Sequence, residues 1–269
     1  MGKVISIFGS PGSGKTTFSV KFANEIAKEK SVIVVFSDIL CPVIPTILDN
    51  ADNKKSLGKI FSSAQVTKDV ILKNCISVNK NLGVIGYAEY ENIFTYPQYT
   101  DVRVVNLIDS LRDLADYIII DLSSNFTTDL LSTTALEISD KVIRMTSSRL
   151  KDICYFNSHL PLLSDMKFKT NEHIRVISNF KSYDAIEELK EVYKIQATFG
   201  YSEEIREQGL CNELFSPLSS KEEKQLKSNL FQIIDLLGGK KEEANIEEGA
   251  NATLFEKIFR KKGSLKYVR

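Results

Sequence analysis

The sequence has little that would indicate a zinc site, a disulfide scaffold or a membrane span. Its four cysteines are far apart and form no CxxC pair; they are Cys41, Cys75, Cys154 and Cys211. Such isolated thiols are typical of a reducing compartment. The N-terminus lacks the pattern of a cleavable leader, and no 18 apolar residues run together. We therefore expect a cytoplasmic chain without a membrane-spanning helix.

An excess of charge of either sign is also missing. Lys and Arg total 35 and Asp and Glu total 35, so the 269-residue chain has a formal net charge of +0. Such a chain has no overall attraction to nucleic acid or anionic lipid, and any binding of that kind must come from a local patch. The hydrophobic content of 43% is enough for one large α/β domain or two small ones.

Short apolar segments alternate with segments of helical periodicity. The apolar segments are nearly continuous, which favours strands of a parallel sheet that is covered on both faces. The predicted strands are residues 4–8, 32–36, 82–87, 117–121, 141–145 and 174–180, and the predicted helices are 16–30, 101–115, 127–139, 185–193 and about 219–239. This βαβα order predicts an α/β fold with a doubly wound, mostly parallel sheet flanked by helices.

The composition changes after Gly238 and Gly239, which are suited to end the last predicted helix. Residues 240–252 are charged and almost free of bulky apolar side chains, which predicts a flexible linker. We therefore expect three parts: a main domain over 1–239, the linker over 240–252, and a tail over 253–269.

A phosphate-binding motif lies between the first predicted strand and the first predicted helix. Residues 9–16 match GxxxxGK[ST] in the strand–loop–helix context that the motif requires. Backbone amides of such a loop surround a phosphate chain, and Lys15 neutralises the β- and γ-phosphates. We expect Thr16 to coordinate Mg²⁺ and Thr17 to bond the α-phosphate. The predicted nucleotide-binding residues of the loop are Gly9, Ser10, Pro11, Gly12, Ser13, Gly14, Lys15, Thr16 and Thr17.

Two aspartates follow predicted strands. Asp121 closes the run YIIID, as a Walker B aspartate does when it holds magnesium through water. Asp38 closes VIVVFSD, and we expect it to bind a metal-bound water or to position the attacking water. Both are predicted to be catalytic together with Lys15, and to be metal ligands together with Thr16. The alternative for each aspartate is a helix cap or a turn former.

With these motifs in this order, the chain resembles the MinD/ParA family of P-loop ATPases from residue 1 to about 237. Asp38 in SDILCPVIP corresponds to the family's switch I aspartate, and Asp121 in DLSSN begins switch II. Asn179 in VISNF falls on the family's adenine-recognising asparagine, and Tyr201 in FGYSEEIREQGL implies adenine stacking. The resemblance implies ATP and Mg²⁺ as ligands and a nucleotide-dependent homodimer. The alternatives are a strand-ending turn for Asn179 and a half-buried aromatic for Tyr201.

The loop and switch II depart from the family pattern. Ser10 replaces the signature lysine that reaches the partner subunit's phosphates, so trans activation by that lysine is lost, and DLSSN lacks the usual proline and glycine. With SDILCPVIPTIL and NIFTYPQY, this is similar to the atypical TadZ/CpaE-like branch, which is associated with pilus or secretion-system assembly. The resemblance implies a slowly hydrolysing positioning protein with a partner in such an apparatus.

The tail, residues 253–269, carries six Lys or Arg against one Glu. Its Leu254, Phe255, Ile258 and Phe259 share one helical face, as in a basic amphipathic helix that lies on an anionic membrane. MinD-like proteins end in a similar segment, so we expect peripheral attachment to the inner face of the cell membrane. Docking on a partner or on the chain's own domain are the alternatives. DNA binding is not expected, because the strongly basic cluster lies beside phenylalanines.

Two other functions share the phosphate loop. A nucleotide-binding scaffold with negligible hydrolysis is suggested by Ser10 and DLSSN. A small-molecule kinase needs clustered arginines to hold the transferring phosphoryl group. The arginines here are dispersed along the sequence, at Arg103, Arg112, Arg144, Arg149, Arg175 and Arg206, which disfavours the kinase.

Overall fold

A computed structural model describes residues 1–49, 51–181 and 186–238 of the chain. The described strands form one eight-stranded sheet in the order β3-β4-β2-β5-β1-β6-β7-β8. Only the β3–β4 pair is antiparallel within this sheet. The strands are β1 (Lys3–Gly9), β2 (Val32–Phe36), β3 (Ile76–Asn79), β4 (Leu82–Ile85), β5 (Tyr117–Asp121), β6 (Lys141–Ser147), β7 (Ile174–Ser178) and β8 (Ala197–Phe199). The predicted doubly wound, mostly parallel sheet is confirmed.

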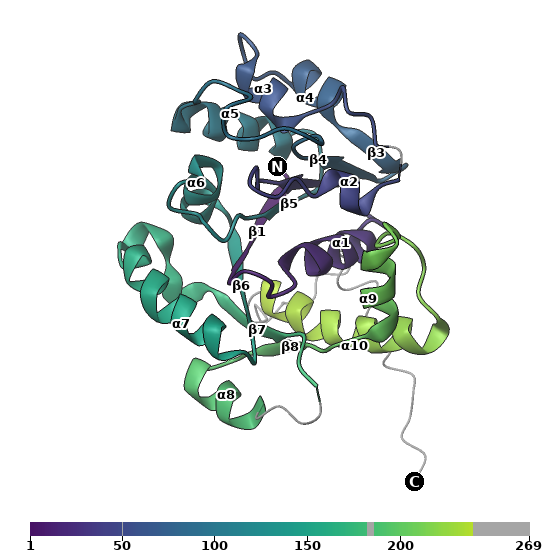
Figure 1. Cartoon of the computed structure of the whole chain (residues 1–269), viewed down its shortest axis with the longest axis vertical. Helices are drawn as coiled ribbons and strands as arrows, with labels where there is room; N and C mark the ends of the chain where they lie inside the picture. Colours follow the sequence, from purple (N-terminus) through teal and green to yellow (C-terminus); the bar gives the residue numbers. More distant parts are fainter. Residues whose placement is uncertain (50, 182–185, 239–269) are drawn as a thin grey trace, which may run out of the picture.

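Helices cover both faces of the sheet (Figure 1). On one face lie α1 (Lys15–Ile26) and α10 (Ser220–Leu237), and on the other lie α5 (Asp101–Arg112), α6 (Leu130–Ile138) and α7 (Leu150–His159). The shorter helices are α2 (Ile44–Ile47), α3 (Leu57–Ser62), α4 (Lys68–Asn74), α8 (Ile186–Tyr193) and α9 (Glu203–Leu210), with 3-10 turns at Leu160–Leu163, Met166–Phe168 and Thr170–Glu172.

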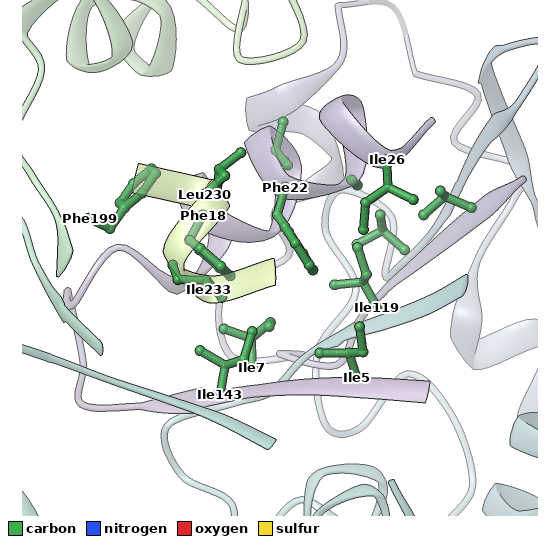
Figure 2. Packing of buried hydrophobic residues seen from close by; sticks show 14 of the residues in the cluster. Ile5, Ile7, Phe18, Phe22, Ile26, Ile119, Ile143, Phe199, Leu230 and Ile233 are labelled. Atoms are coloured by element: carbon green, nitrogen blue, oxygen red, sulfur yellow. The ribbon is translucent and has the colours of Figure 1, made fainter. Parts of the chain in front are cut away.

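Two hydrophobic clusters, one on each face, explain why the strand sequences are apolar throughout. In β1, Ile5 and Ile7 join the cluster under α1 and α10, whereas Val4 and Phe8 join the cluster under α5, α6 and α7. All four side chains are fully buried. Figure 2 shows the first cluster, in which aromatic side chains of α1 pack against the sheet and α10. Burial on both faces removes the polar alternation of a half-exposed strand.

Several elements differ from the sequence-based expectation. The edge strands β3 and β8 are not predicted: β3 alternates half-buried and exposed residues, and β8 has three residues. The predicted strands 82–87 and 174–180 end two residues early, and the second gives way to Asn179, whose φ is 55°. Helical periodicity also did not indicate α2, α3, α4 and α7, three of which have seven residues or fewer.

The predicted linker (240–252) and tail (253–269) lie outside the described residues, so both stay predictions. Within the described ranges, no helix combines the length and the apolar character needed to cross a bilayer. All four cysteines fall within these ranges and are free thiols, three of them exposed.

Candidate functional site

The loop between β1 and α1 has the shape of a phosphate cradle. Gly12 and Gly14 have φ values of 71° and 78°, in the left-handed region that favours glycine. The turn between them is closed by the Ser13 backbone N–H and the Ser13 hydroxyl, which donate to the Ser10 carbonyl at 3.2 and 2.8 Å. The Ser10 side chain is fully buried, and its hydroxyl has no hydrogen-bond partner among the described residues. The backbone is thus bent as the motif predicts, with residue 10 turned inward.

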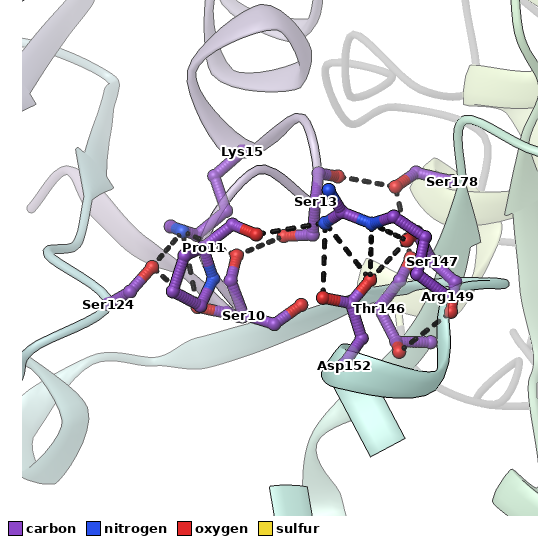
Figure 3. A network of polar contacts seen from close by, with 11 residues as sticks. Ser10, Pro11, Ser13, Lys15, Ser124, Thr146, Ser147, Arg149, Asp152 and Ser178 are labelled. Carbon is purple, nitrogen blue, oxygen red and sulfur yellow. Dashed lines mark hydrogen bonds and ion pairs between the residues drawn. The ribbon is translucent and has the colours of Figure 1, made fainter. Parts of the chain in front are cut away.

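Lys15 is folded across this loop (Figure 3). Its Nζ donates to the carbonyls of Gly9 and Ser10 at 3.1 Å each and to the Ser124 hydroxyl at 2.5 Å. Burial lowers the pKa of Lys15, while the negative charges of Asp121 and Asp38 act in the opposite direction. The Lys15 ammonium therefore lies against the loop, at the position where a phosphate would bind.

Asp121, the last residue of β5, lies against the first turn of α1. The Thr16 hydroxyl donates to Asp121 Oδ2 at 2.6 Å, and the buried Oδ1 atom has no hydrogen-bond partner among the described residues. Burial raises the pKa of Asp121 to about 6, although the charge of Lys15 and the Thr16 hydrogen bond lower it. A buried carboxylate oxygen without a partner is costly unless a cation or a water completes the site.

These residues fit a magnesium ion. Mg²⁺ takes oxygen ligands in octahedral geometry and commonly keeps several waters besides one or two protein ligands and phosphate oxygens. The Thr16 hydroxyl and Asp121 supply ligands of this type, and no described residue forms a hydrogen bond with Asp121 Oδ1. Among the described residues there is no group of three or more His, Cys, Asp or Glu side chains that would hold a metal without a nucleotide. The site therefore suits a metal that arrives with phosphate.

Asp38 follows β2, which is hydrogen-bonded directly to β5. Its carboxylate accepts a hydrogen bond from the Leu40 backbone N–H at 2.9 Å, as a turn-forming aspartate does. The same carboxylate acts electrostatically on Lys15 and Asp121. The structure thus brings Asp38, Asp121 and Lys15 together, and Asp38 also fills the structural role that was its alternative.

A cavity of about 700 Å³ extends from the loop over the carboxyl ends of β6, β7 and β8. Of the predicted loop residues, Gly12, Gly14, Lys15, Thr16 and Thr17 line it, whereas Gly9, Ser10, Pro11 and Ser13 lie outside its lining. Its volume suits a nucleotide-sized ligand. The cavity lies on the β6 side of the loop, and Asp121 and Asp38 follow strands on its β5 side.

Asn179 and Tyr201 line the far wall of this cavity. The side chain of Asn179 is exposed, while its backbone N–H donates to the Phe199 carbonyl at 3.0 Å and so ends β7. The Lys181 ammonium lies 4.5 Å from the centre of the Tyr201 ring. The Tyr201 hydroxyl donates to Glu203. One face of Tyr201 is therefore already occupied by a cation.

Ser124 is a site residue that the sequence analysis missed. Its hydroxyl accepts from Lys15 and donates to the Gly9 carbonyl at 3.0 Å, and its own carbonyl accepts from the Tyr155 hydroxyl at 2.6 Å. The preceding Ser123 backbone N–H donates to the hydroxyl of Ser37 at 2.8 Å, which ties the ends of β2 and β5. In the sequence, the position of Ser123 and Ser124 directly after the strand that ends in Asp121 could have indicated that these hydroxyls lie at the site.

Arg149 was also missed. It follows β6, lines the cavity and donates from Nη2 to the Pro11 carbonyl at 2.9 Å. Arg206, from α9, lines the same cavity. The arginines that are dispersed in the sequence thus include two that line the same cavity, so dispersal along the chain is a weaker argument against a kinase.

The chain matches one family model and many solved structures over most of its length. A family model described as an AAA domain matches residues 2–174. No curated protein matches. Among solved structures, a ParA family ATPase from Chlorobium tepidum TLS is similar with a TM-score of 0.71 and 18% identity, over 89% of this chain and 99% of that one.

Two further structures contain nucleotides. The septum site-determining protein MinD from Pyrococcus horikoshii OT3, complexed with Mg-ADP, has a TM-score of 0.68 and 19% identity over 91% of this chain and 100% of that one. A putative plasmid partition protein from Borrelia burgdorferi B31, bound to AMPPNP, has a TM-score of 0.66 and 19% identity over 87% and 99%. With the family match covering more than half of its residues, the chain belongs to the AAA-domain family and has the fold of the MinD and ParA ATPases.

Proposed function

We propose that the chain binds ATP with Mg²⁺ at this loop and hydrolyses it slowly. The observation that carries this proposal is the Thr16–Asp121 pair beside Lys15, with a buried carboxylate oxygen that has no hydrogen-bond partner within the described part of the chain. The bound AMPPNP and Mg-ADP of two similar structures support the choice of ligand.

Each residue has a role in this proposal. Lys15 leaves the carbonyls of Gly9 and Ser10 and binds the β- and γ-phosphates. Thr16 and Asp121 would hold the metal ion, which when bound neutralises charge on the phosphates. Asp38 orients the attacking water from the end of β2. Hydrolysis is slow because position 10 carries a buried serine, so no side chain from that position reaches a partner's phosphates.

Nucleotide binding is tested by titration calorimetry with Mg-ATP and Mg-ADP on the parent chain and on Lys15→Ala. Lys28→Ala is the matched control, because Lys28 lies just beyond the same helix and pairs with Glu25 and Glu223 on the surface. We expect Lys15→Ala to abolish measurable binding and Lys28→Ala to leave it unchanged. Equal affinity in all three proteins would refute the proposal.

Hydrolysis is tested by phosphate release from the parent, Lys15→Ala and Asp38→Ala chains. We expect slow turnover in the parent and none above background in the variants. A parent chain that binds ATP but releases phosphate only at the Lys15→Ala rate would instead be a scaffold. Ser10 and the hydrogen bond that holds Lys15 on Ser124 favour this second function.

The biological role that we propose is that of a positioning protein in the TadZ/CpaE-like branch. Its nucleotide state would govern a homodimer and a partner in a pilus or secretion apparatus, with residues 253–269 attaching to the inner face of the cell membrane. The basic amphipathic pattern of the tail supports this attachment. Two tails in a dimer would bind far more strongly than one.

Co-sedimentation with anionic liposomes tests the membrane role. Full-length protein and a chain ending at residue 252 are compared in ATP and in ADP, with neutral liposomes as the control. We expect only the full-length protein in ATP to sediment with anionic liposomes. Failure of the full-length protein to bind in either nucleotide would overturn the membrane role and leave ATP binding untouched.

A further inference from the structure

Arg149 lies directly on the phosphate loop. Its Nη2 donates to the Pro11 carbonyl at 2.9 Å, and Nη1 lies 3.1 Å from the position that a Cβ atom on Gly12 would take. Figure 3 shows the guanidinium between the loop and Asp152. An arginine from the end of β6 therefore covers the same turn that the glycines of the loop shape.

Ser147 and Asp152 hold the Arg149 guanidinium in one orientation, on the side away from the cavity. Nε donates to the Ser147 hydroxyl at 2.9 Å and to Asp152 Oδ2 at 3.1 Å, and Nη2 donates to Asp152 Oδ1 at 3.0 Å. The Asp152 side chain is 1% exposed, whereas that of Arg149 is 38% exposed. The carboxylate thus lies on the protein side of the pair and the guanidinium on the cavity side.

The cavity has cations at two places. Lys15 and Arg149 lie against the phosphate loop, whereas Lys181 and Arg206 contact Tyr201 at the other end. Lys15 also meets the carboxylates of Asp121 and Asp38 on the β5 side of the loop. On the cavity side, the Arg149 guanidinium lies beside Gly12, and both residues line the cavity.

We propose that Arg149 binds the phosphate chain of a nucleoside di- or triphosphate from within the same subunit. This inference rests on the proposed function, because it concerns the ligand of the same loop. The guanidinium suits this task, because a charged donor forms a strong hydrogen bond to a phosphate oxygen. Asp152 fixes it before the ligand arrives and leaves Nη1 beside Gly12. Since residue 10 is a buried serine, the second cation of the site is Arg149 of the same chain, two residues after β6, instead of residue 10 of a partner.

A purely structural role must be separated from phosphate binding, because Arg149 also bonds the Pro11 carbonyl. Two variants do so. Arg149→Lys keeps a positive charge but loses the fork that joins Pro11 to Asp152. Arg149→Gln keeps a hydrogen-bond donor to Pro11 but loses the charge. Arg206→Ala removes another arginine of the same cavity, away from the loop, and serves as the matched control.

The experiment is titration calorimetry with Mg-ADP on the parent and these variants, with adenosine affinity measured by displacement and urea midpoints measured without ligand. Loss of a charge-assisted hydrogen bond is expected to weaken Mg-ADP binding about tenfold or more in Arg149→Gln. Because Arg149→Lys keeps the positive charge, it should retain more Mg-ADP affinity than Arg149→Gln. Adenosine affinity should stay within about twofold in both variants. Arg206→Ala should weaken Mg-ADP binding less than Arg149→Gln does.

Four outcomes overturn the inference. Mg-ADP affinity that is unchanged in Arg149→Gln, or reduced equally in the Lys and Gln variants, would assign Arg149 to the loop's structure alone. Equal losses for adenosine and Mg-ADP would do the same. If the parent chain binds no nucleotide, the proposed function falls and the inference falls with it, whereas the first results leave the proposed function standing.

Discussion

Asp121 is expected to destabilise the nucleotide-free protein at neutral pH. Burial raises its pKa from 3.8 to about 6. The unfolded chain therefore releases the proton before the folded chain does. The free energy of unfolding falls as the pH rises from about 4 to 6, and the loss is constant above that range. A difference of about two pH units corresponds to about 3 kcal/mol at neutral pH.

The assay is urea unfolding of the parent and Asp121→Asn without nucleotide, at pH 4 and pH 7.5. Asparagine can still accept the Thr16 hydrogen bond but has no proton to lose. We expect the variant to gain about 3 kcal/mol relative to the parent between the two pH values. Comparing the two pH values cancels any effect of the substitution that does not depend on ionisation.

Asp116→Asn provides a control of opposite sign. Hydrogen bonds from the Ser31 backbone and hydroxyl lower the pKa of Asp116, so its stabilising effect is present at neutral pH and fades as the pH falls below 4. Asp116→Asn should therefore lose stability relative to the parent at pH 7.5. A parent-to-variant difference at Asp121 that stays constant with pH, or that favours the parent at pH 7.5, would refute the reasoning.

Three further predictions concern the loop and its supporting helix. Ser124→Ala removes the hydroxyl that holds the Lys15 ammonium near Asp121. Titration calorimetry should show a loss of affinity for Mg-ATP that exceeds the loss for Mg-ADP. Equal losses would contradict this prediction. Gly12→Ala places a side chain on a residue in the left-handed conformation, beside the Arg149 guanidinium, and should weaken Mg-ADP binding about tenfold or more. Gly209→Ala is the control: Gly209 lines the same cavity, but an added side chain there makes only ordinary contacts, so the affinity should not change. Burial lowers the pKa of Lys21 to about 8, so the free energy of unfolding should rise as the pH increases from 8 to 10, and urea titrations of Lys21→Met should lack that rise.

The sequence was sufficient for the central part of the fold. Six strands were predicted because burial on both faces makes their residues apolar throughout, as in β1. The edge strands have no continuous apolar run that would reveal them. β3 is exposed on one side, and the three residues of β8 are too few to show a strand periodicity. Short helices such as α2, with four residues, are held by packing rather than by an amphipathic pattern.

The candidate site likewise contains residues that the sequence could predict and residues that it could not. The loop motif and Asp121 were predictable because their chemistry lies in short contiguous stretches with a known context. Arg149 lies more than 130 positions after the loop, and its contact with Pro11 exists only because β6 is the neighbour of β1. The spacing of such a pair along the chain carries no signal, since the helices and loops between them have no fixed length.

The loop motif alone does not determine how this site holds phosphate, because residues from both neighbouring strands fix the loop. Ser124, after β5, bonds the Gly9 carbonyl, while Arg149, after β6, bonds the Pro11 carbonyl. Ser178, at the end of β7, donates to the Ser13 carbonyl. Three carbonyls of the loop are thereby satisfied, as buried backbone acceptors must be. Ser10 is therefore one residue of a cradle that Ser124, Arg149 and Ser178 hold in place.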